Sequence, residues 1–245
     1  GGRSSGRETI ARVAAGAVAA KILEQLGITF TTYTRSIGNI MIDYNKFDTE
    51  EILRNKIYMP DADAAARAGE YIVEMTKEHD SVGGCVEAVI HGVPAGLGDT
   101  VFEKLDANLA KALMSIGAVK CIEIGDGISV SSALGSNDND GFTTDANGNI
   151  TPLTNHAGGI LGGMSDGADI ILRASFKATP SILKEQHTVT QSGKPIDVSI
   201  KGRHDPVVVP RAVVVVEAMS AITILDALLV NMSATMDGLL RFYKH

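Results

Sequence analysis

The stretch GGRSSGRET at residues 1–9 leads directly into a segment, Glu8 to Leu26, whose composition favours a helix. Free backbone N–H groups at a helix start attract anions, and guanidinium groups pair with carboxylate or phosphate. Arg3 and Arg7 stand at that start, so the loop is a candidate anion site. The alternative is an ordinary capped helix entry. The residues at helical spacing that predict the packed face are Ile10, Val13, Ala14 and Ala17.

A second arginine loop is GRHDP at residues 202–206. It sets Arg203 two residues before the carboxylate of Asp205, with His204 between them and a rigid proline behind. A permanently charged guanidinium beside a carboxylate and an imidazole can bind an anion and move a proton at one place. The alternative is a turn in which Asp205 caps the following segment.

Hydrophobic periodicity predicts a mixed order of helices and strands between the two loops. Helices are expected at 49–56, 63–78 and 103–116, and strands at 28–33, 82–91, 118–124 and 170–176. Residues 135–163 are polar and glycine-rich, with a hairpin-turn signal at 147–148, and we expect this long loop to be functional. Another hairpin is expected around 192–193. Pro210 is expected to open a long C-terminal helix, because proline favours the first helical turn.

Composition favours one soluble domain that binds a small anion. The 245 residues are 44% hydrophobic, which is enough to bury a sizeable core. A formal charge of −7 argues against a general nucleic-acid surface but permits a local basic pocket. Cys85 and Cys121 lack metal-ligand spacing, so we expect no metal site and predict both to be reduced, buried strand residues.

No membrane span is predicted from the sequence. The most apolar stretches, 213–216 and 222–230, are interrupted by Glu217 and Asp226 at positions that a spanning helix would avoid. We therefore expect a buried helix there and a cytoplasmic protein.

Five groups of residues stand in an order that resembles the chorismate synthase family along essentially the whole chain. They are the segment 1–17, SVGG (81–84) with GVPAGLG (92–98), AVK (118–120) with EIGDG (123–127), NHAGGILGG (155–163), and the segment 202–212. The resemblance implies an α+β fold with helices sandwiched between β-sheets in pseudo-twofold halves, usually assembled as a homotetramer. We expect residues 1–245 to form a single domain, a truncated core of that fold.

The resemblance also implies an activity and a set of site residues. Enzymes of the family convert 5-enolpyruvylshikimate 3-phosphate to chorismate and phosphate by a 1,4-elimination that requires reduced FMN, a step of aromatic amino acid biosynthesis. Arg3, Arg7 and Arg203 would bind the carboxylates and phosphate of the substrate. Asp205 would relay a proton at the flavin N5. The residues implied to border FMN are Arg3, Ser4, Ser5, Gly117, Ala118, Gly162, Lys177, Ala178, Thr179, Pro180, Ser181 and Arg203.

One departure from the family is the absence of a Gly-Glu-Ser-His-Gly segment and of a second histidine just ahead of the first arginine loop. Because these groups would act near the flavin and the departing phosphate, the chain alone is expected to be inactive. The favoured interpretation is the larger part of an FMN-dependent lyase. The alternatives are a flavin- or anion-binding module without catalysis and a fragment that serves oligomer assembly.

Overall fold

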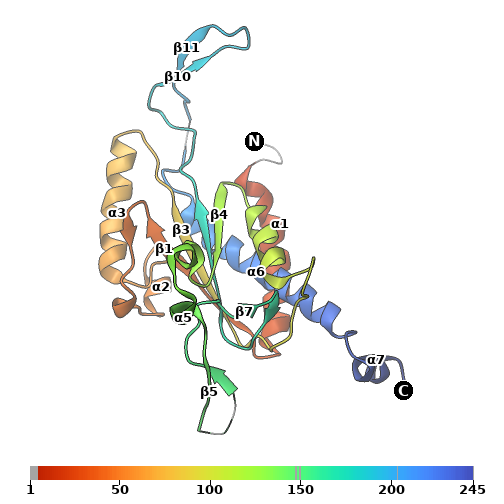
Figure 1. Cartoon of the computed structure of the whole chain (residues 1–245). Coiled ribbons are helices and arrows are strands. Elements are labelled where there is room, and N and C mark those ends of the chain that lie inside the picture. The colour runs from red at the N-terminus through yellow and green to blue at the C-terminus, as the bar shows by residue number, and fades with distance from the viewer. Residues whose placement is uncertain (1–4, 147, 149, 203, 245) are drawn as a thin grey trace. The chain divides into compact units, whose positions relative to one another are not determined.

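The computed structural model describes residues 5–146, 148, 150–202 and 204–244, and Figure 1 shows the arrangement of its elements. The α-helices are α1 (Thr9–Glu24), α2 (Glu51–Arg54), α3 (Ala62–Lys77), α4 (Leu105–Met114), α5 (Gly135–Asp138), α6 (Val209–Asn231) and α7 (Met236–Tyr243). The 3-10 helices are η2 (Gly6–Glu8), η3 (Tyr44–Lys46) and η4 (Gly127–Ser132). The strands are β1 (Thr29–Ile37), β2 (Ile40–Met41), β3 (Gly84–His91), β4 (Val119–Ile124), β5 (Phe142–Thr144), β6 (Ile150–Pro152), β7 (Ile160–Leu161), β8 (Met164–Ser165), β9 (Ile170–Phe176), β10 (Gln186–Val189) and β11 (Pro195–Val198).

The largest sheet has the strand order β2-β1-β3-β9-β4, and the pairs β5-β6, β7-β8 and β10-β11 form separate antiparallel ribbons. In β9, burial alternates residue by residue, as expected of a strand with one face on the core. Ile170, Leu172, Ala174 and Phe176 face inward. Helices combined with antiparallel pairing confirm the α+β class.

The chain divides into two compact units, which are described separately below. Unit 1 comprises Gly1–Thr32, Glu87–Ala174 and Val214–His245, and unit 2 comprises Tyr33–Val86 and Ser175–Val213. The arrangement of the chain as a single domain stays a prediction.

Within unit 1, α1 packs very closely on α6. Gly16, Ala19 and Leu23 are the buried residues of α1, spaced along one helical face. A Cβ added at Gly16 would lie 2.3 Å from the Cβ of Ala218, so glycine permits this close approach. The predicted face was therefore wrong in phase: Ile10 is 78% exposed, because the small Gly16 sets the side on which α6 lies.

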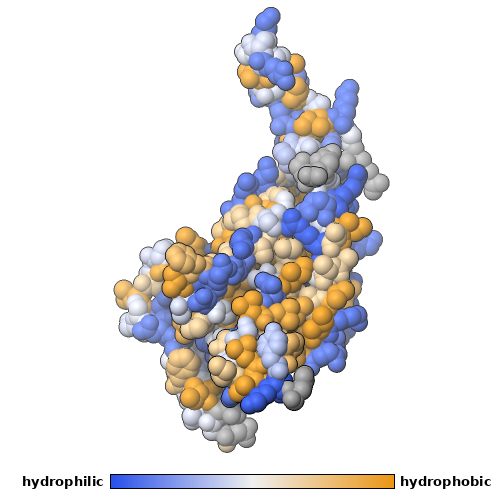
Figure 2. Space-filling model, turned by 90° about the vertical axis from the view of Figure 1, so that its right-hand side faces the viewer, coloured by the Kyte–Doolittle hydropathy of each residue, from blue (hydrophilic) through white to orange (hydrophobic). Residues whose placement is uncertain are grey.

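The outer sides of these two helices carry uncovered apolar side chains. On α1 they include Val18, at 61% exposure, and on α6 they include Leu229, at 57%. Figure 2 shows apolar side chains gathered on a broad surface of the molecule.

The long helix α6 begins as predicted, with Pro210 in its first turn. Buried residues recur along its first part, as expected, from Val209 to Ile224, although Val214 there is 49% exposed. Leu229 and Val230 near its end are exposed. By length and composition, α6 is also the one helix among the described residues that could cross a membrane, which is weak evidence because the core helix of a soluble protein passes the same test.

Other predicted elements changed in extent. The strand at 170–176 has the predicted bounds, and the hairpin near 192–193 is formed by β10 and β11. The helix expected at 49–56 is reduced to α2, because the Asn55 side chain donates to the Glu51 carbonyl oxygen at 2.8 Å where the helix ends. The glycine-rich segment contains α5 and the short strands β5 to β7, so it is more regular than predicted.

The two cysteines lie in different environments. Cys85 is buried in β3, as predicted. Cys121 is exposed, so that prediction was wrong, because β4 is the last strand of the sheet order and has a neighbour on one side only.

Candidate functional site

In unit 1, the described part of the first arginine loop starts at Ser5, and the predicted residues Arg3 and Ser4 lie outside the described residues. The Ser5 hydroxyl accepts a hydrogen bond from the backbone N–H of Arg7 at 3.3 Å and caps η2. The Arg7 side chain is exposed, so its guanidinium group is accessible to an anion. The capped helix entry is therefore present, and it does not conflict with anion binding by Arg7.

A residue that the sequence did not single out, Arg12, ties this loop to the end of α4. Its Nε donates to Glu8 at 3.0 Å, and its Nη1 donates to the Ser115 hydroxyl at 2.6 Å. Ser115 is the C-cap of α4 and is followed by the predicted cofactor residues Gly117 and Ala118. The structure thus links Ser5 and Arg7 to those residues through one guanidinium group.

Ala118 occupies a backbone conformation that residues other than glycine rarely adopt. Its φ is +73°, in the left-handed region. This turns the chain sharply from α4 into β4. A Cβ added at Gly117 would meet nothing within 4 Å, so the backbone there is open to a ligand.

The predicted cofactor residue Gly162 lies at the other end of α4. It forms, with Gly163, the tight turn between β7 and β8, where both glycines have positive φ. The Gly163 carbonyl oxygen accepts a hydrogen bond from the N–H of Leu105 at 2.8 Å, at the start of α4. Because α4 has 10 residues, about 15 Å of helix separates Gly162 from Gly117. A ligand that touches both must be extended.

In unit 2, the predicted residues 177–181 form an irregular loop directly after β9. Lys177, Ala178 and Pro180 are exposed, while Thr179 and Ser181 are half-buried. The Thr179 Oγ1 atom is buried and has no hydrogen-bond partner among the described residues. A buried hydroxyl without a partner is costly, so this atom is suited to a bound group.

The second arginine loop belongs to the same unit, and its Arg203 lies outside the described residues. The Nε2 atom of His204 is buried and, within the part of the chain that the structure describes, lacks a hydrogen-bond partner. The next residue, Asp205, accepts a hydrogen bond from Arg211 Nη1 at 2.5 Å. Asp205 is therefore held by a cation that sequence reasoning missed, since Arg211 lies six positions further along the chain.

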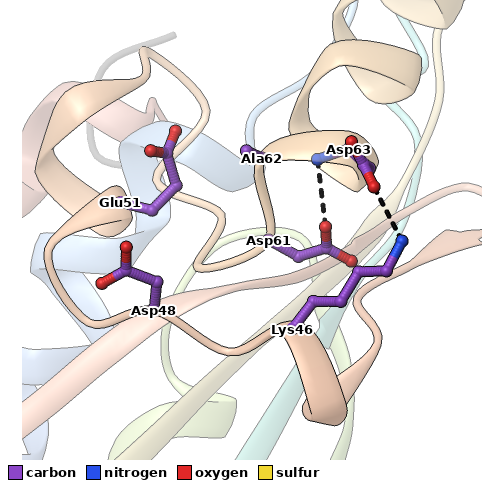
Figure 3. Close-up of a pocket in the computed structure, with 6 residues that line it drawn as sticks. All are labelled: Lys46, Asp48, Glu51, Asp61, Ala62 and Asp63. Carbon is purple, nitrogen blue, oxygen red and sulfur yellow. Dashed lines mark hydrogen bonds and ion pairs between the residues drawn. The ribbon is translucent and has the colours of Figure 1, made fainter.

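None of the predicted site residues lines the shallow pocket of about 210 Å³ in unit 2 (Figure 3). Asp61 caps α3 there and accepts hydrogen bonds from the backbone of Asp43, Asp63 and Ala64. Burial opposes its ionisation, but these donors prevail and lower the pKa of Asp61. Carboxylates outnumber the single ammonium group of Lys46, so the pocket repels anions. The residues that line it are Lys46, Asp48, Glu51, Asp61, Ala62 and Asp63.

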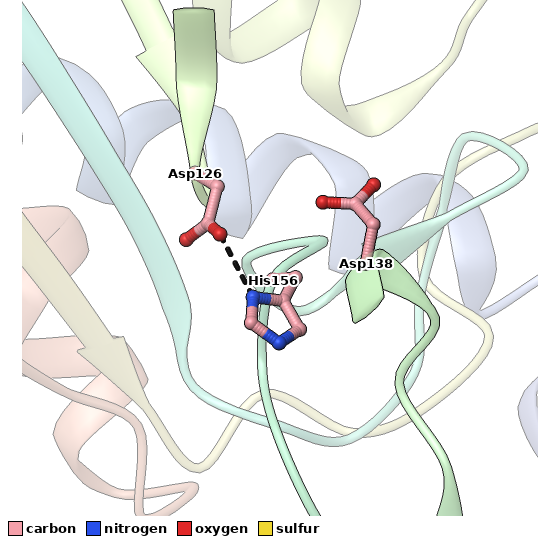
Figure 4. Close-up of side chains that lie close together, drawn as sticks. All are labelled: Asp126, Asp138 and His156. Atoms are coloured by element: carbon pink, nitrogen blue, oxygen red, sulfur yellow. Dashed lines mark hydrogen bonds and ion pairs between the residues drawn. The ribbon is translucent and has the colours of Figure 1, made fainter. Parts of the chain in front are cut away.

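In unit 1, His156 of the glycine-rich segment lies near the carboxylates of Asp126 and Asp138 (Figure 4). Its Nδ1 is 2.8 Å from Asp126 Oδ2, and this hydrogen bond raises the pKa of His156. One possible ligand atom from each of Asp126, Asp138 and His156 lies within 4.8 Å of the others. Asp140 accepts the backbone N–H groups of His156 and Ala157 at 2.8 and 2.9 Å. These hydrogen bonds hold the backbone around His156 in place, which gives the cluster a structural role.

Comparison with known proteins gives a consistent result. A family model described as chorismate synthase matches residues 1–229. A chorismate synthase from Agathobacter rectalis is 62% identical over 244 residues, which cover 100% of this chain and 66% of the relative. One from Gloeothece citriformis is 50% identical over 94% of this chain and 64% of the relative.

A solved structure described as a crystal structure of chorismate synthase superposes with a TM-score of 0.78 at 30% sequence identity. The match covers 94% of this chain and 65% of that one. The chain thus spans about 66% of the length of several curated relatives that it matches.

Proposed function

Since the chain belongs to the chorismate synthase family, we propose that it forms the larger part of a lyase. In the proposed reaction, 5-enolpyruvylshikimate 3-phosphate loses phosphate and a ring proton in a 1,4-elimination and becomes chorismate. Reduced FMN is the proposed cofactor.

The observation that carries the proposal is a pair of buried polar atoms without partners among the described residues, Thr179 Oγ1 and His204 Nε2. They stand in the two loops of unit 2 that the family resemblance assigns to the cofactor and the substrate. A flavin phosphate or ring offers hydrogen-bond partners to both kinds of atom. The residues present therefore fit the cofactor.

The remaining proposed cofactor contacts are of two kinds. Gly117 and Gly162 have no neighbour in the space that a Cβ would fill, so a ligand can approach their backbone closely. Lys177 is exposed and offers an ammonium group to the ribityl phosphate. When bound, the reduced flavin supplies the electron-rich ring that this elimination requires, although substrate and product differ by no net oxidation.

The proposed substrate has two carboxylates and one phosphate, and Arg3, Arg7 and Arg203 are its proposed ligands. A guanidinium group stays charged when water is excluded and gives two parallel hydrogen bonds to such groups. Arg7 is exposed and capable of reaching a ligand.

Asp205 is the proposed proton relay at the flavin N5. Its carboxylate accepts a hydrogen bond from Arg211, which holds it in place, and a positioned carboxylate can accept a proton and return it. The adjacent His204 is the nearest imidazole in sequence and offers a second group through which a proton can move.

Assembly and location belong to the same proposal. A homotetramer is supported by the uncovered apolar side chains on α1 and α6, which a second subunit can bury. A cytoplasmic location is supported by Cys85 and Cys121, neither of which forms a disulfide bond among the described residues.

The test is anaerobic phosphate release from 5-enolpyruvylshikimate 3-phosphate with reduced FMN, together with FMN binding followed by fluorescence. The chain is assayed alone and after supplementation with the remainder of the Agathobacter rectalis relative. Asp205→Asn should abolish turnover and leave binding intact. Asp197→Asn is the matched control, since Asp197 also forms an ion pair, with His187 in the β10-β11 ribbon.

The outcomes separate the possible functions. Turnover that Asp205→Asn removes supports the lyase. Binding of FMN and substrate without turnover in either assay indicates the binding module. Absence of binding of both FMN and the anionic substrate refutes both and leaves oligomer assembly.

A further inference from the structure

Thr179 Oγ1 and His204 Nε2 of unit 2 lack hydrogen-bond partners among the described residues. The two loops that carry them are both attached to one short segment, residues 80–83. Residues 80–83 lie about a hundred positions before Thr179 and more than 120 before His204.

The first attachment is a side-chain bond. The Ser81 hydroxyl donates to the carbonyl oxygen of Thr179 at 2.6 Å. This bond holds the residue whose own hydroxyl lacks a hydrogen-bond partner among the described residues. It therefore fixes the backbone from which Thr179 Oγ1 projects.

The second attachment reaches the other loop. The backbone N–H of Val82 donates to the carbonyl oxygen of Pro206 at 2.8 Å. Pro206 lies two residues after His204. Neighbouring residues of one segment thus hold the two loops, Ser81 the first and Val82 the second.

Gly83 brings the segment against the end of β9. A Cβ added there would lie 2.4 Å from the carbonyl oxygen of Phe176 and 3.1 Å from the backbone nitrogen of Ala178. Real side chains do not approach backbone atoms so closely. Only glycine allows this contact without moving the start of the 177–181 loop.

Asp80 secures the segment from its other end. Its carboxylate accepts the Ser81 N–H at 2.8 Å and the Lys184 ammonium group at 2.9 Å. The Lys184 hydrogen bond and the Ser81 N–H lower the pKa of Asp80, which therefore stays charged at neutral pH. Lys184, which follows the 177–181 loop, is thus bound to the same segment.

We propose that residues 80–83 are a positioning segment that sets the spacing of Thr179 and His204, so that both meet one bound flavin. This rests on the proposed cofactor. The four residues do not touch the flavin themselves. They act through the loops that they hold.

The test compares Ser81→Ala with Thr76→Val, a control that also removes a hydroxyl bonded to a backbone carbonyl, in this case that of Ile72 within α3. Loss of the Ser81 bond should weaken FMN binding about 2- to 10-fold. Thr76→Val should leave the FMN dissociation constant unchanged. Ser81→Thr retains the hydroxyl and should therefore bind FMN as tightly as the unmodified chain. Melting temperatures are measured for all three variants to separate binding from stability.

Amide hydrogen exchange supplies a readout that does not depend on FMN. Ser81→Ala should raise exchange in peptides covering residues 177–183 and residues 204–208, while Thr76→Val raises neither. Gly83→Ala should raise both further. Exchange that rises at 177–183 alone, or an FMN dissociation constant that Ser81→Ala does not change, overturns the positioning role. If the unmodified chain binds no FMN, the cofactor proposal fails, and the exchange pattern alone decides whether the segment holds both loops.

Discussion

The contact between α1 and α6 predicts that Gly16→Ala destabilises the protein although alanine is the better helix former. The added Cβ would lie 2.3 Å from the Cβ and 2.4 Å from the Cα of Ala218. Carbon atoms prefer to be about 3.5–4.0 Å apart, so α1 would have to retreat by about 1.2 Å. That retreat would loosen the packing of Ala19 and Leu23, which are buried on the same face.

The expected change in the free energy of unfolding follows from two opposed effects. Overpacking a core costs about 1–3 kcal/mol, and the upper end applies because a backbone atom blocks the new methyl group. Alanine regains about 1 kcal/mol of helix propensity over glycine. We therefore expect Gly16→Ala to lower the free energy of unfolding by about 2 kcal/mol.

Urea unfolding with a matched control checks this prediction. Gly69 lies in α3, where an added Cβ would meet one atom, at an ordinary 3.7 Å. Gly69→Ala should therefore raise the free energy of unfolding by about 0.5–1 kcal/mol. The double variant Gly16→Ala/Ala218→Gly should recover part of the loss, because the Cα of residue 218 still stands in the way. If Gly16→Ala proves as stable as Gly69→Ala, the packing argument is refuted.

Three further predictions concern single groups in unit 1. The Asp126 bond raises the pKa of His156 above 6.5, so its stabilising contribution is full below that pH and lost as the pH rises through the folded-state pKa. The stability difference between wild type and His156→Gln should accordingly shrink from pH 6 to pH 8 in urea titrations, and a growing difference would contradict it. Arg173→Met should cost about 3–5 kcal/mol of unfolding free energy, because it removes the guanidinium bonded to Glu87, a carboxylate that is 2% exposed; a loss under about 1 kcal/mol would count against the buried pair. Ala118→Gly should raise the melting temperature slightly, since it relieves a φ of +73° worth about 1 kcal/mol, and a lower melting temperature would argue against strain there.

Much of the fold could be predicted because the decisive signals are local. The alternation of Ile170, Leu172, Ala174 and Phe176 predicted β9 with its observed bounds. Pro210 marked the first turn of α6 correctly. The helix α7 was missed because it has 8 residues, none of them buried, and a helix so short is marginal on its own.

The face of α1 could not be predicted from its own sequence. Its apolar residues are spread around the helix, and the deciding feature is the close approach of Ala218 to Gly16, two hundred residues apart. Hydrophobicity favoured Ile10, but a missing side chain decided which side lies against α6.

The residues of the candidate site could be predicted from the sequence, but the contacts that hold them in place could not. The sequence pointed to Thr179 and Asp205 through a family resemblance. Ser81 and Arg12 stand in segments that carry the same resemblance, but nothing in the sequence predicted their contacts with Thr179, 98 positions away, and Ser115, 103 positions away. Contacts over such separations arise only when the sheet and helices have formed.

The uncovered apolar side chains of α1 and α6 also bear on how the purified protein should be stored. Attraction between apolar surfaces weakens on cooling and strengthens with sulfate or phosphate salts. A concentrated stock should therefore stay clear for longer in the cold room than on the bench. Ammonium sulfate should cause the protein to aggregate at a low salt concentration. Light scattering should detect this aggregation before any helix unfolds.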